Sequence, residues 1–145
     1  MIIRVFHYGD FERVCEIENM CFSQPYDVNS LIRLYEAGFG FFVAEEDNEV
    51  VGYVIFGINM KCEGHIISIA VDKNYRGLKI GSNLLRHALM IYIQSGINKV
   101  VLEVRTHNIP AINLYKSFGF VIDRKEFNYY GDGSDAYIMY LDCPC

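Results

Sequence analysis

The chain has 145 residues, of which 52% are hydrophobic and 21% charged, and its formal net charge at pH 7 is −5. This length and composition predict one folded globular domain, residues 1–145, and exclude a disordered chain. An acidic net charge with scattered lysines and arginines does not favour nucleic acid as the main partner.

Targeting and cysteine patterns indicate where the protein works. The N-terminal stretch MIIRVFHYGDFERV lacks the apolar core and the cleavage site of a secretory signal, and no window has the uninterrupted apolar length of a membrane helix. We therefore expect a soluble, cytoplasmic protein without a membrane partner. Five cysteines without CxxC spacing favour neither a disulfide framework nor a zinc site. The terminal Cys143-Pro-Cys145 is interpreted as an uncommitted tail.

The first part of the chain predicts a strand and two helices. The segment IIRVFH is typical of a short strand. Asp10 can cap a helix that runs to about Met20. Pro25 ends this region because its ring cannot continue a helix, and a second helix can start at Asp27 or Asn29. The residues spaced for one face of the first helix are Val14, Ile17 and Glu18.

The middle of the chain predicts a hairpin, a further strand and a long helix. Residues 39–46 and 50–60 are rich in aromatic and β-branched residues and flank the turn sequence DNE. The segment 64–71, GHIISIAV, is another expected strand. Apolar residues then recur at helical spacing over 80–95, and Gly96 suits the end of that helix.

The last part predicts a strand at 99–104, a short helix at 108–118, and strands at 120–127 and 135–142. Asn108 is placed to cap the short helix and Gly119 to end it. The element order is β-α-α-β-β-β-α-β-α-β-β. We expect a mixed α/β fold, with about seven mostly antiparallel strands in a central sheet that about four helices flank.

One turn stands out because it joins the strand at 64–71 to the long helix and contains Arg76, Gly77, Lys79 and Gly81. Backbone N–H groups at a helix N-terminus can bind phosphate, and glycine lets the anion come close. The sequence matches neither GxxxxGK[ST] nor GxGxxG. By itself, the pattern is equally compatible with a tight turn that packs the helix.

In its context, the segment ISIAVDKNYRGLKIGSNLL resembles the acetyl-CoA-binding motif of the GNAT superfamily of N-acetyltransferases. That motif has Arg or Gln, two residues, Gly, one residue, and Gly or Ala; Arg76 and Gly81 fit, and Lys79 replaces the middle glycine. The resemblance implies that the turn binds the pyrophosphate of acetyl-CoA and that the preceding strand pairs with its pantetheine arm. The implied cofactor-binding residues are Ile69, Ala70, Val71, Arg76, Gly77, Leu78, Lys79, Ile80, Gly81, Ser82 and Asn108.

Lys79 is a departure from the motif with two open consequences. Its N–H remains usable provided that its φ is negative. Its ammonium can contact phosphate or point into solvent.

The segment LEVRTHNIPAINLYKSFGF resembles the second diagnostic segment of the family, and the two motifs together identify the chain as a member. Asn108 has a capping role in any case, and the resemblance implies a further contact with coenzyme A. Tyr115 has the spacing of a core aromatic residue. The resemblance implies instead that it lies beside the thioester sulfur and protonates the leaving thiolate.

Glu103 occupies the middle of a strand, on the face that carries Val101 and Arg105. A glutamate is unfavourable there unless it is solvated, paired or functional. An ion pair with Arg105 is the simple explanation. A closer resemblance offers another: LEVR, NLYKSFGF and NYYGDGSDAYIM resemble the branch that acetylates protein N-termini, which includes the RimI-like ribosomal-protein-alanine and the archaeal N-terminal acetyltransferases. It implies Glu103 as general base and Tyr115 as general acid.

The same branch implies the peptide-binding residues. These are Tyr129 and Tyr130 before a Gly-Asp-Gly sequence, and Phe22, Pro25 and Tyr26 between the first two helices. Members often have Trp after that proline, whereas this chain has Tyr26 and no Trp. The accepted first residue of the substrate is therefore not predicted.

The expected activity is acetyl transfer from acetyl-CoA to the free α-amine of protein N-termini, ribosomal proteins included, without a metal ion. One alternative is a GNAT enzyme for lysine side chains, polyamines or another small amine. Another is a catalytically silent acyl-CoA sensor or partner subunit. The YYGDGSDAYIM loop favours the first activity, and the presence of both Glu103 and Tyr115 argues against a silent protein.

Overall fold

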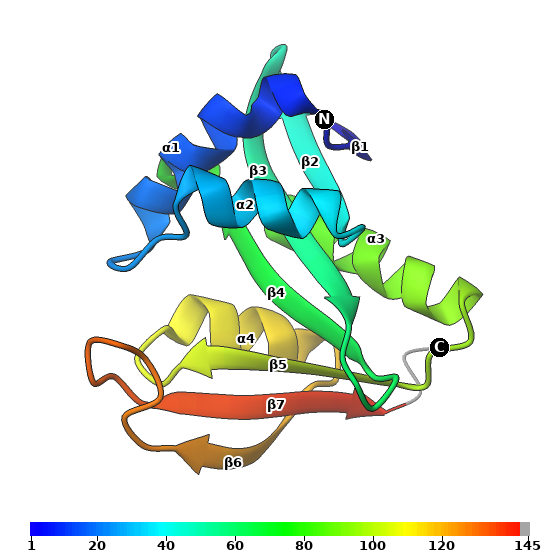
Figure 1. The fold of residues 1–145 in the computed structure, drawn as a ribbon, viewed down its shortest axis with the longest axis vertical. Coiled ribbons are helices and arrows are strands. Elements are labelled where there is room, and N and C mark those ends of the chain that lie inside the picture. The colour runs from blue at the N-terminus through cyan, green and yellow to red at the C-terminus, as the bar shows by residue number, and fades with distance from the viewer. Residues whose placement is uncertain (143–145) are drawn as a thin grey trace. The chain divides into compact units, whose positions relative to one another are not determined.

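The computed structural model describes residues 1–142, so the Cys143-Pro-Cys145 tail lies outside the described residues. Seven strands and four α-helices follow the predicted order, with two short 3-10 helices added (Figure 1). The helices are α1 (Phe11–Cys21), α2 (Val28–Glu36), α3 (Ile80–Gln94) and α4 (Ile109–Ser117). The strands are β1 (Ile2–Val5), β2 (Gly40–Glu46), β3 (Glu49–Ile58), β4 (Gly64–Val71), β5 (Lys99–Arg105), β6 (Val121–Glu126) and β7 (Ala136–Asp142).

The strands form one sheet with the order β1-β2-β3-β4-β5-β7-β6, which confirms the predicted mixed fold. The pairs β1–β2, β2–β3, β5–β7 and β6–β7 are antiparallel. β4 and β5 are parallel and pair at Gly64↔Val100 and His65↔Val101. No helix within residues 1–142 is both long and apolar enough to cross a membrane.

The chain divides into two compact units, and it passes from one to the other at the last residue of β3, inside β4 and inside α3. The first unit comprises Met1–Gly57 and Ser68–Ala88. The second comprises Ile58–Ile67 and the chain from Leu89 onward. The expectation that residues 1–145 form a single domain stays a prediction.

The first unit shows how local sequence sets the helix and strand ends. β2 and β3 meet in a two-residue turn, because Asp47 and Asn48 both adopt the positive φ that hairpin turns of this kind require. Of the two predicted starts of α2, Asp27 and Asn29, the structure selects Asp27, which accepts from Ser30 N at 2.8 Å. The predicted cap at Asp10 is wrong: its side chain makes no capping bond to α1. Its carboxylate is instead occupied by the Arg4 guanidinium, at 2.8 and 2.9 Å.

The second unit follows the expected strand alternation. Along β5, Val100, Leu102 and Val104 are buried, whereas Val101, Glu103 and Arg105 are partly exposed. Hydrophobic residues therefore hold one face of the strand, and Glu103 lies on the other. The stops of α3 and α4 are confirmed too, since Gly96 and Gly119 adopt the positive φ typical of residues that follow a helix.

Candidate active site

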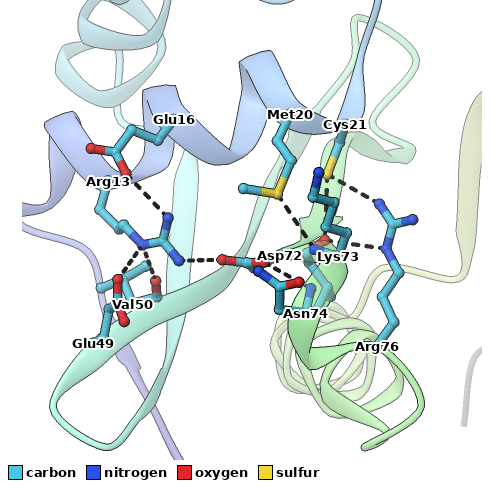
Figure 2. A network of polar contacts seen from close by, with 11 residues as sticks. Arg13, Glu16, Met20, Cys21, Glu49, Val50, Asp72, Lys73, Asn74 and Arg76 are labelled. Carbon is cyan, nitrogen blue, oxygen red and sulfur yellow. Dashed lines mark hydrogen bonds and ion pairs between the residues drawn. The ribbon is translucent and has the colours of Figure 1, made fainter.

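The turn that resembles the cofactor motif is anchored in the first unit by Asp72, which follows β4 and is 3% exposed. Asp72 accepts from Asn74 N at 2.9 Å, which caps the 3-10 helix Lys73–Tyr75. Its other oxygen pairs with the guanidinium of Arg13 on α1, and Arg13 Nε also donates to the Val50 carbonyl at 2.8 Å (Figure 2). Burial by itself would raise the pKa of Asp72, but the Asn74 N–H and Arg13 outweigh it and lower that pKa.

The turn itself is exposed over Arg76, Gly77, Leu78 and Lys79. Gly77 has φ 84° and Lys79 has φ 62°. The expectation of a negative φ at Lys79 is therefore wrong. Lys79 adopts a left-handed backbone conformation, which is normally found at glycine. For a lysine this backbone has a conformational cost of about 1–2 kcal/mol.

α3 begins directly after this turn. The Lys79 carbonyl accepts from the backbone N–H of Asn83 at 3.0 Å and from its side-chain amide at 2.9 Å. Ile80 is 2% exposed and fixes the start of the helix in the core, while Gly81 and Ser82 are partly exposed. The first-turn N–H groups of a helix have no partner inside the helix, so they are donors for an anion.

Two further groups of predicted residues belong to the first unit. On β4, Ile69 and Val71 are partly exposed and Ala70 is buried. The Val71 carbonyl accepts from Cys21 Sγ and from Arg76 Nε, each at 3.4 Å, which links α1 to the strand and the turn. Between α1 and α2, Phe22 and Pro25 are half-buried and Tyr26 is 43% exposed.

In the second unit, Glu103 pairs with His65 rather than with Arg105. Nε2 of His65 lies 2.9 Å from each carboxylate oxygen of Glu103, and their side chains are 28% and 23% exposed. The pair joins β4 to β5, on which Glu103 lies. Sequence reasoning missed His65; the signal was a titratable side chain in the largely apolar strand GHIISIAV.

The backbone of His65 is held by Tyr92 of α3, which is 2% exposed. The Tyr92 hydroxyl accepts from His65 N at 3.1 Å and donates to the His65 carbonyl at 3.2 Å. Gly64, which precedes His65, leaves room for the Tyr92 ring. A Cβ at this position would lie only 2.8 Å from Cζ of Tyr92. Tyr92 therefore holds the main chain that carries this imidazole, and Glu103 bonds the ring itself.

Tyr115 of α4 is 5% exposed and lies at the core, against Phe120. Burial first, and then the charges of Tyr130 and Glu103, raise the pKa of Tyr115. The phenol thus keeps its proton throughout the neutral range, and it lies close enough to Glu103 to sense its charge. On the same helix, Asn108 is confirmed as the cap, with its Oδ1 accepting from Ala111 N at 3.3 Å.

Arg105 organises the loop that contains Tyr129 and Tyr130. Its guanidinium lies 4.0 Å over the Tyr130 ring, and its Nη1 donates to the two oxygens of Asp132 at 3.0 and 2.9 Å. The Tyr129 and Tyr130 rings pack edge to face with centroids 5.0 Å apart. The simple explanation of Glu103 as the ion-pair partner of Arg105 is therefore wrong, because Arg105 is bonded to Asp132.

The predicted residues fall into two sets, each assembled within its own unit. The first unit contains the turn, residues 69–71 of the preceding strand, and residues 22, 25 and 26. The second contains Glu103, Tyr115, Asn108, Tyr129 and Tyr130. Within residues 1–142, no group of three His, Cys, Asp or Glu side chains is placed to hold a metal ion.

Known proteins resemble this chain in sequence and in structure. The model of the acetyltransferase (GNAT) family matches residues 11–120. A relative from Methanocaldococcus jannaschii, named as an uncharacterized N-acetyltransferase, is 41% identical over 99% of this chain and 93% of its own length. An N-alpha-acetyltransferase from Sulfurisphaera tokodaii is 38% identical over 94% of this chain and 90% of its own.

Among solved structures, Ard1 from Thermoplasma volcanium superposes with a TM-score of 0.92 and 33% identity, covering 97% of this chain and 96% of that one. The family match spans most of the chain, and these likenesses extend over nearly all of it. The chain therefore belongs to the acetyltransferase (GNAT) family and is an acetyltransferase.

Proposed function

We propose that this protein transfers an acetyl group from acetyl-CoA to the free α-amine of protein N-termini, ribosomal proteins among the candidate substrates. The observation that carries the proposal is the state of Glu103. Its carboxylate is partly exposed, is bonded to His65 rather than neutralised by Arg105, and lies within electrostatic reach of Tyr115. The relative named as an N-alpha-acetyltransferase supports the choice of amine.

An α-amine needs little help from a general base, because part of it is already neutral at pH 7. With a pKa of about 7.7–8.0, roughly 10–17% of such an amine is neutral at pH 7, against about 0.04% for lysine. One carboxylate, acting directly or through a water molecule, is then sufficient. This is what the partly exposed Glu103 offers.

In the proposed reaction, the neutral amine nitrogen attacks the thioester carbonyl carbon and forms the C–N bond. Glu103 takes the proton that the nitrogen loses, and the C–S bond breaks. Tyr115 gives its proton to the departing thiolate, so that the products are the acetylated N-terminus and coenzyme A. His65 holds the Glu103 carboxylate in place, and it can accept the proton that Glu103 has taken from the amine.

The cofactor is proposed to bind at the turn of the first unit. The exposed backbone from Arg76 to Lys79, the left-handed Gly77 and Lys79, and the first N–H groups of α3 suit a pyrophosphate. Backbone N–H groups near Ile69 are proposed to polarise the thioester carbonyl. Asn108 is proposed to contact coenzyme A in addition to capping α4.

Peptide recognition is proposed to involve Tyr129 and Tyr130 in the second unit and Phe22, Pro25 and Tyr26 in the first. These residues combine apolar area with polar groups that can bond a peptide main chain. Tyr129 and Tyr26 are well exposed, at 48% and 43%. The Arg105 guanidinium stacks on the Tyr130 ring and so restricts its orientation.

The test is release of coenzyme A from acetyl-CoA with peptides that differ only at residue one. Each peptide is compared with a version whose N-terminus is already acetylated and which keeps an internal lysine. We expect turnover with free N-termini and none with the blocked peptides. Turnover confined to internal lysine, or to polyamines, would contradict the proposal and favour a GNAT enzyme for those amines.

A further inference from the structure

Glu18, near the end of α1, is a buried carboxylate for which the proposed reaction has no use. It is 1% exposed and lies in the first unit, as do all its hydrogen-bond partners. Oε1 accepts from the Tyr53 hydroxyl of β3 and, at 3.0 Å, from the Ser68 hydroxyl of β4. Oε2 accepts from the backbone N–H of Tyr26 at 3.0 Å.

These three donors are neutral, so the carboxylate is stabilised by hydrogen bonds alone. Burying such a group is costly unless its lone pairs are used, and an apolar side chain would fill the same volume without that cost. Burial raises the pKa of Tyr53, as does the charge of Glu18, so Tyr53 remains a donor. What an apolar residue could not do is accept a hydrogen bond from the main chain at Tyr26.

The Tyr26 N–H belongs to the loop between α1, which ends at Cys21, and α2, which Asp27 caps. This loop carries Phe22, Pro25 and the exposed Tyr26 ring. Its main chain is therefore fixed at two adjacent residues: Glu18 holds Tyr26, and Asp27 holds the first turn of α2. Tyr26 cannot change its backbone position without leaving a buried carboxylate oxygen unsatisfied.

The two carboxylate oxygens of Glu18 bind different parts of the first unit. Oε1 faces β3 and β4, where Ser68 directly precedes Ile69 of the proposed cofactor strand, and Oε2 faces the loop. We propose that Glu18, anchored by the Tyr53 and Ser68 hydroxyls, is a positioning residue that fixes the α1–α2 loop for substrate N-termini. The proposal rests on the proposed function, which assigns that loop to the peptide.

The test separates the acceptor from the volume of the side chain. Glu18→Met keeps length and removes both oxygens, whereas Glu18→Gln keeps one oxygen that can face Tyr26 N while its amide group donates to the two hydroxyls. Glu12→Met, on the exposed face of the same helix, is the matched control. For each protein, hydrogen exchange of the Tyr26 amide is measured by NMR, along with kcat, KM for the peptide and the affinity for acetyl-CoA.

With Glu18→Met we expect Tyr26 exchange and peptide KM to rise about tenfold, as the loss of one buried hydrogen bond would give. We expect kcat and acetyl-CoA affinity to stay within about twofold, because neither the base nor the pyrophosphate turn is touched. Glu18→Gln should lie within about threefold of the wild type, and Glu12→Met should match it. If Glu18 had only a structural role, Glu18→Met would weaken the binding of both the peptide and acetyl-CoA.

Two results would overturn the inference. One is a folded Glu18→Met protein whose Tyr26 exchange and peptide KM are those of the wild type. The other needs no variant: a Tyr26 amide in the wild-type protein that exchanges as freely as an unstructured loop. Both differ from failure of the proposed function, in which the wild type itself acetylates no peptide N-terminus.

Discussion

Glu18 in the first unit and Glu103 in the second are both carboxylates that touch residues of β4, yet their surroundings differ. Glu18 is 1% exposed, and three neutral donors occupy its oxygens. The Glu103 side chain is 23% exposed and shares its oxygens with one imidazole nitrogen. A buried carboxylate whose oxygens already accept three hydrogen bonds can hold a loop but is not accessible to a substrate, whereas a partly exposed carboxylate beside a histidine can take up and release a proton.

The same contrast extends to the rest of each unit. In the first, Asp72 is buried and fixed by Arg13 and Asn74, and the turn after it offers backbone N–H groups. In the second, Tyr115 retains its proton close to Glu103, and Arg105 and Asp132 form a partly exposed pair. We infer that changes at Glu103 and Tyr115 act on turnover and that changes at the turn and at the α1–α2 loop act on binding.

Glu103→Gln should have the largest effect. It removes the proposed base but keeps the size of the side chain, so kcat at neutral pH should fall about 100-fold or more, the usual contribution of a general base. Acetyl-CoA affinity should not change. Steady-state rates and a direct binding measurement check both parts, and turnover equal to the wild type would remove Glu103 from this role.

Tyr115→Phe should have the next largest effect, a fall in kcat of about 10- to 100-fold with little change in peptide KM. The ring stays packed against Phe120, so stability should change little; a thermal melt serves as the control for that. An acyl-CoA substrate with a more acidic thiol should recover part of the lost rate, since its thiolate leaves without a proton. An equal loss with both thiols would contradict the role of acid.

Substitutions of Lys79, in the first unit, should have a smaller effect, and it should appear in the affinity for acetyl-CoA. Lys79→Met removes the ammonium and keeps the left-handed strain, whereas Lys79→Gly removes both. We expect both variants to bind acetyl-CoA about threefold more weakly, as the loss of one exposed charge contact would give, with kcat unchanged. Isothermal titration at two salt concentrations measures this. Wild-type affinity in both would show that only the backbone of the turn matters.

The smallest expected effect is the pH dependence of the Arg105–Asp132 pair. The Ser134 N–H and hydroxyl, and then Arg105, lower the pKa of Asp132 from 3.8 to about 2. Because the folded pKa is depressed, the stabilisation is present above pH 3.8 and is lost as pH falls toward 2. The difference in urea midpoint between wild type and Asp132→Asn should accordingly shrink over that window. A difference that stays constant down to pH 2.5 would contradict this linkage.

Local sequence was sufficient for the elements and their ends. Asn108, Asp27, Gly96 and Gly119 act at helix ends through bonds and dihedral angles that involve only near neighbours in the chain. The strand alternation of β5 likewise placed Glu103 on the partly exposed face. Such features follow from residues a few positions apart, which is why pattern alone predicted them.

Partners of the polar side chains were decided only by the tertiary structure. Glu103 bonds to His65, 38 residues earlier, because β4 and β5 pair in parallel in one register across an intervening helix. Asp10 lost its expected cap to Arg4, and Lys79 took a left-handed backbone that its own propensity disfavours. These outcomes depend on the path of the folded backbone, which sets the groups that lie within hydrogen-bond reach and the φ of the turn, and composition and periodicity carry no information about either.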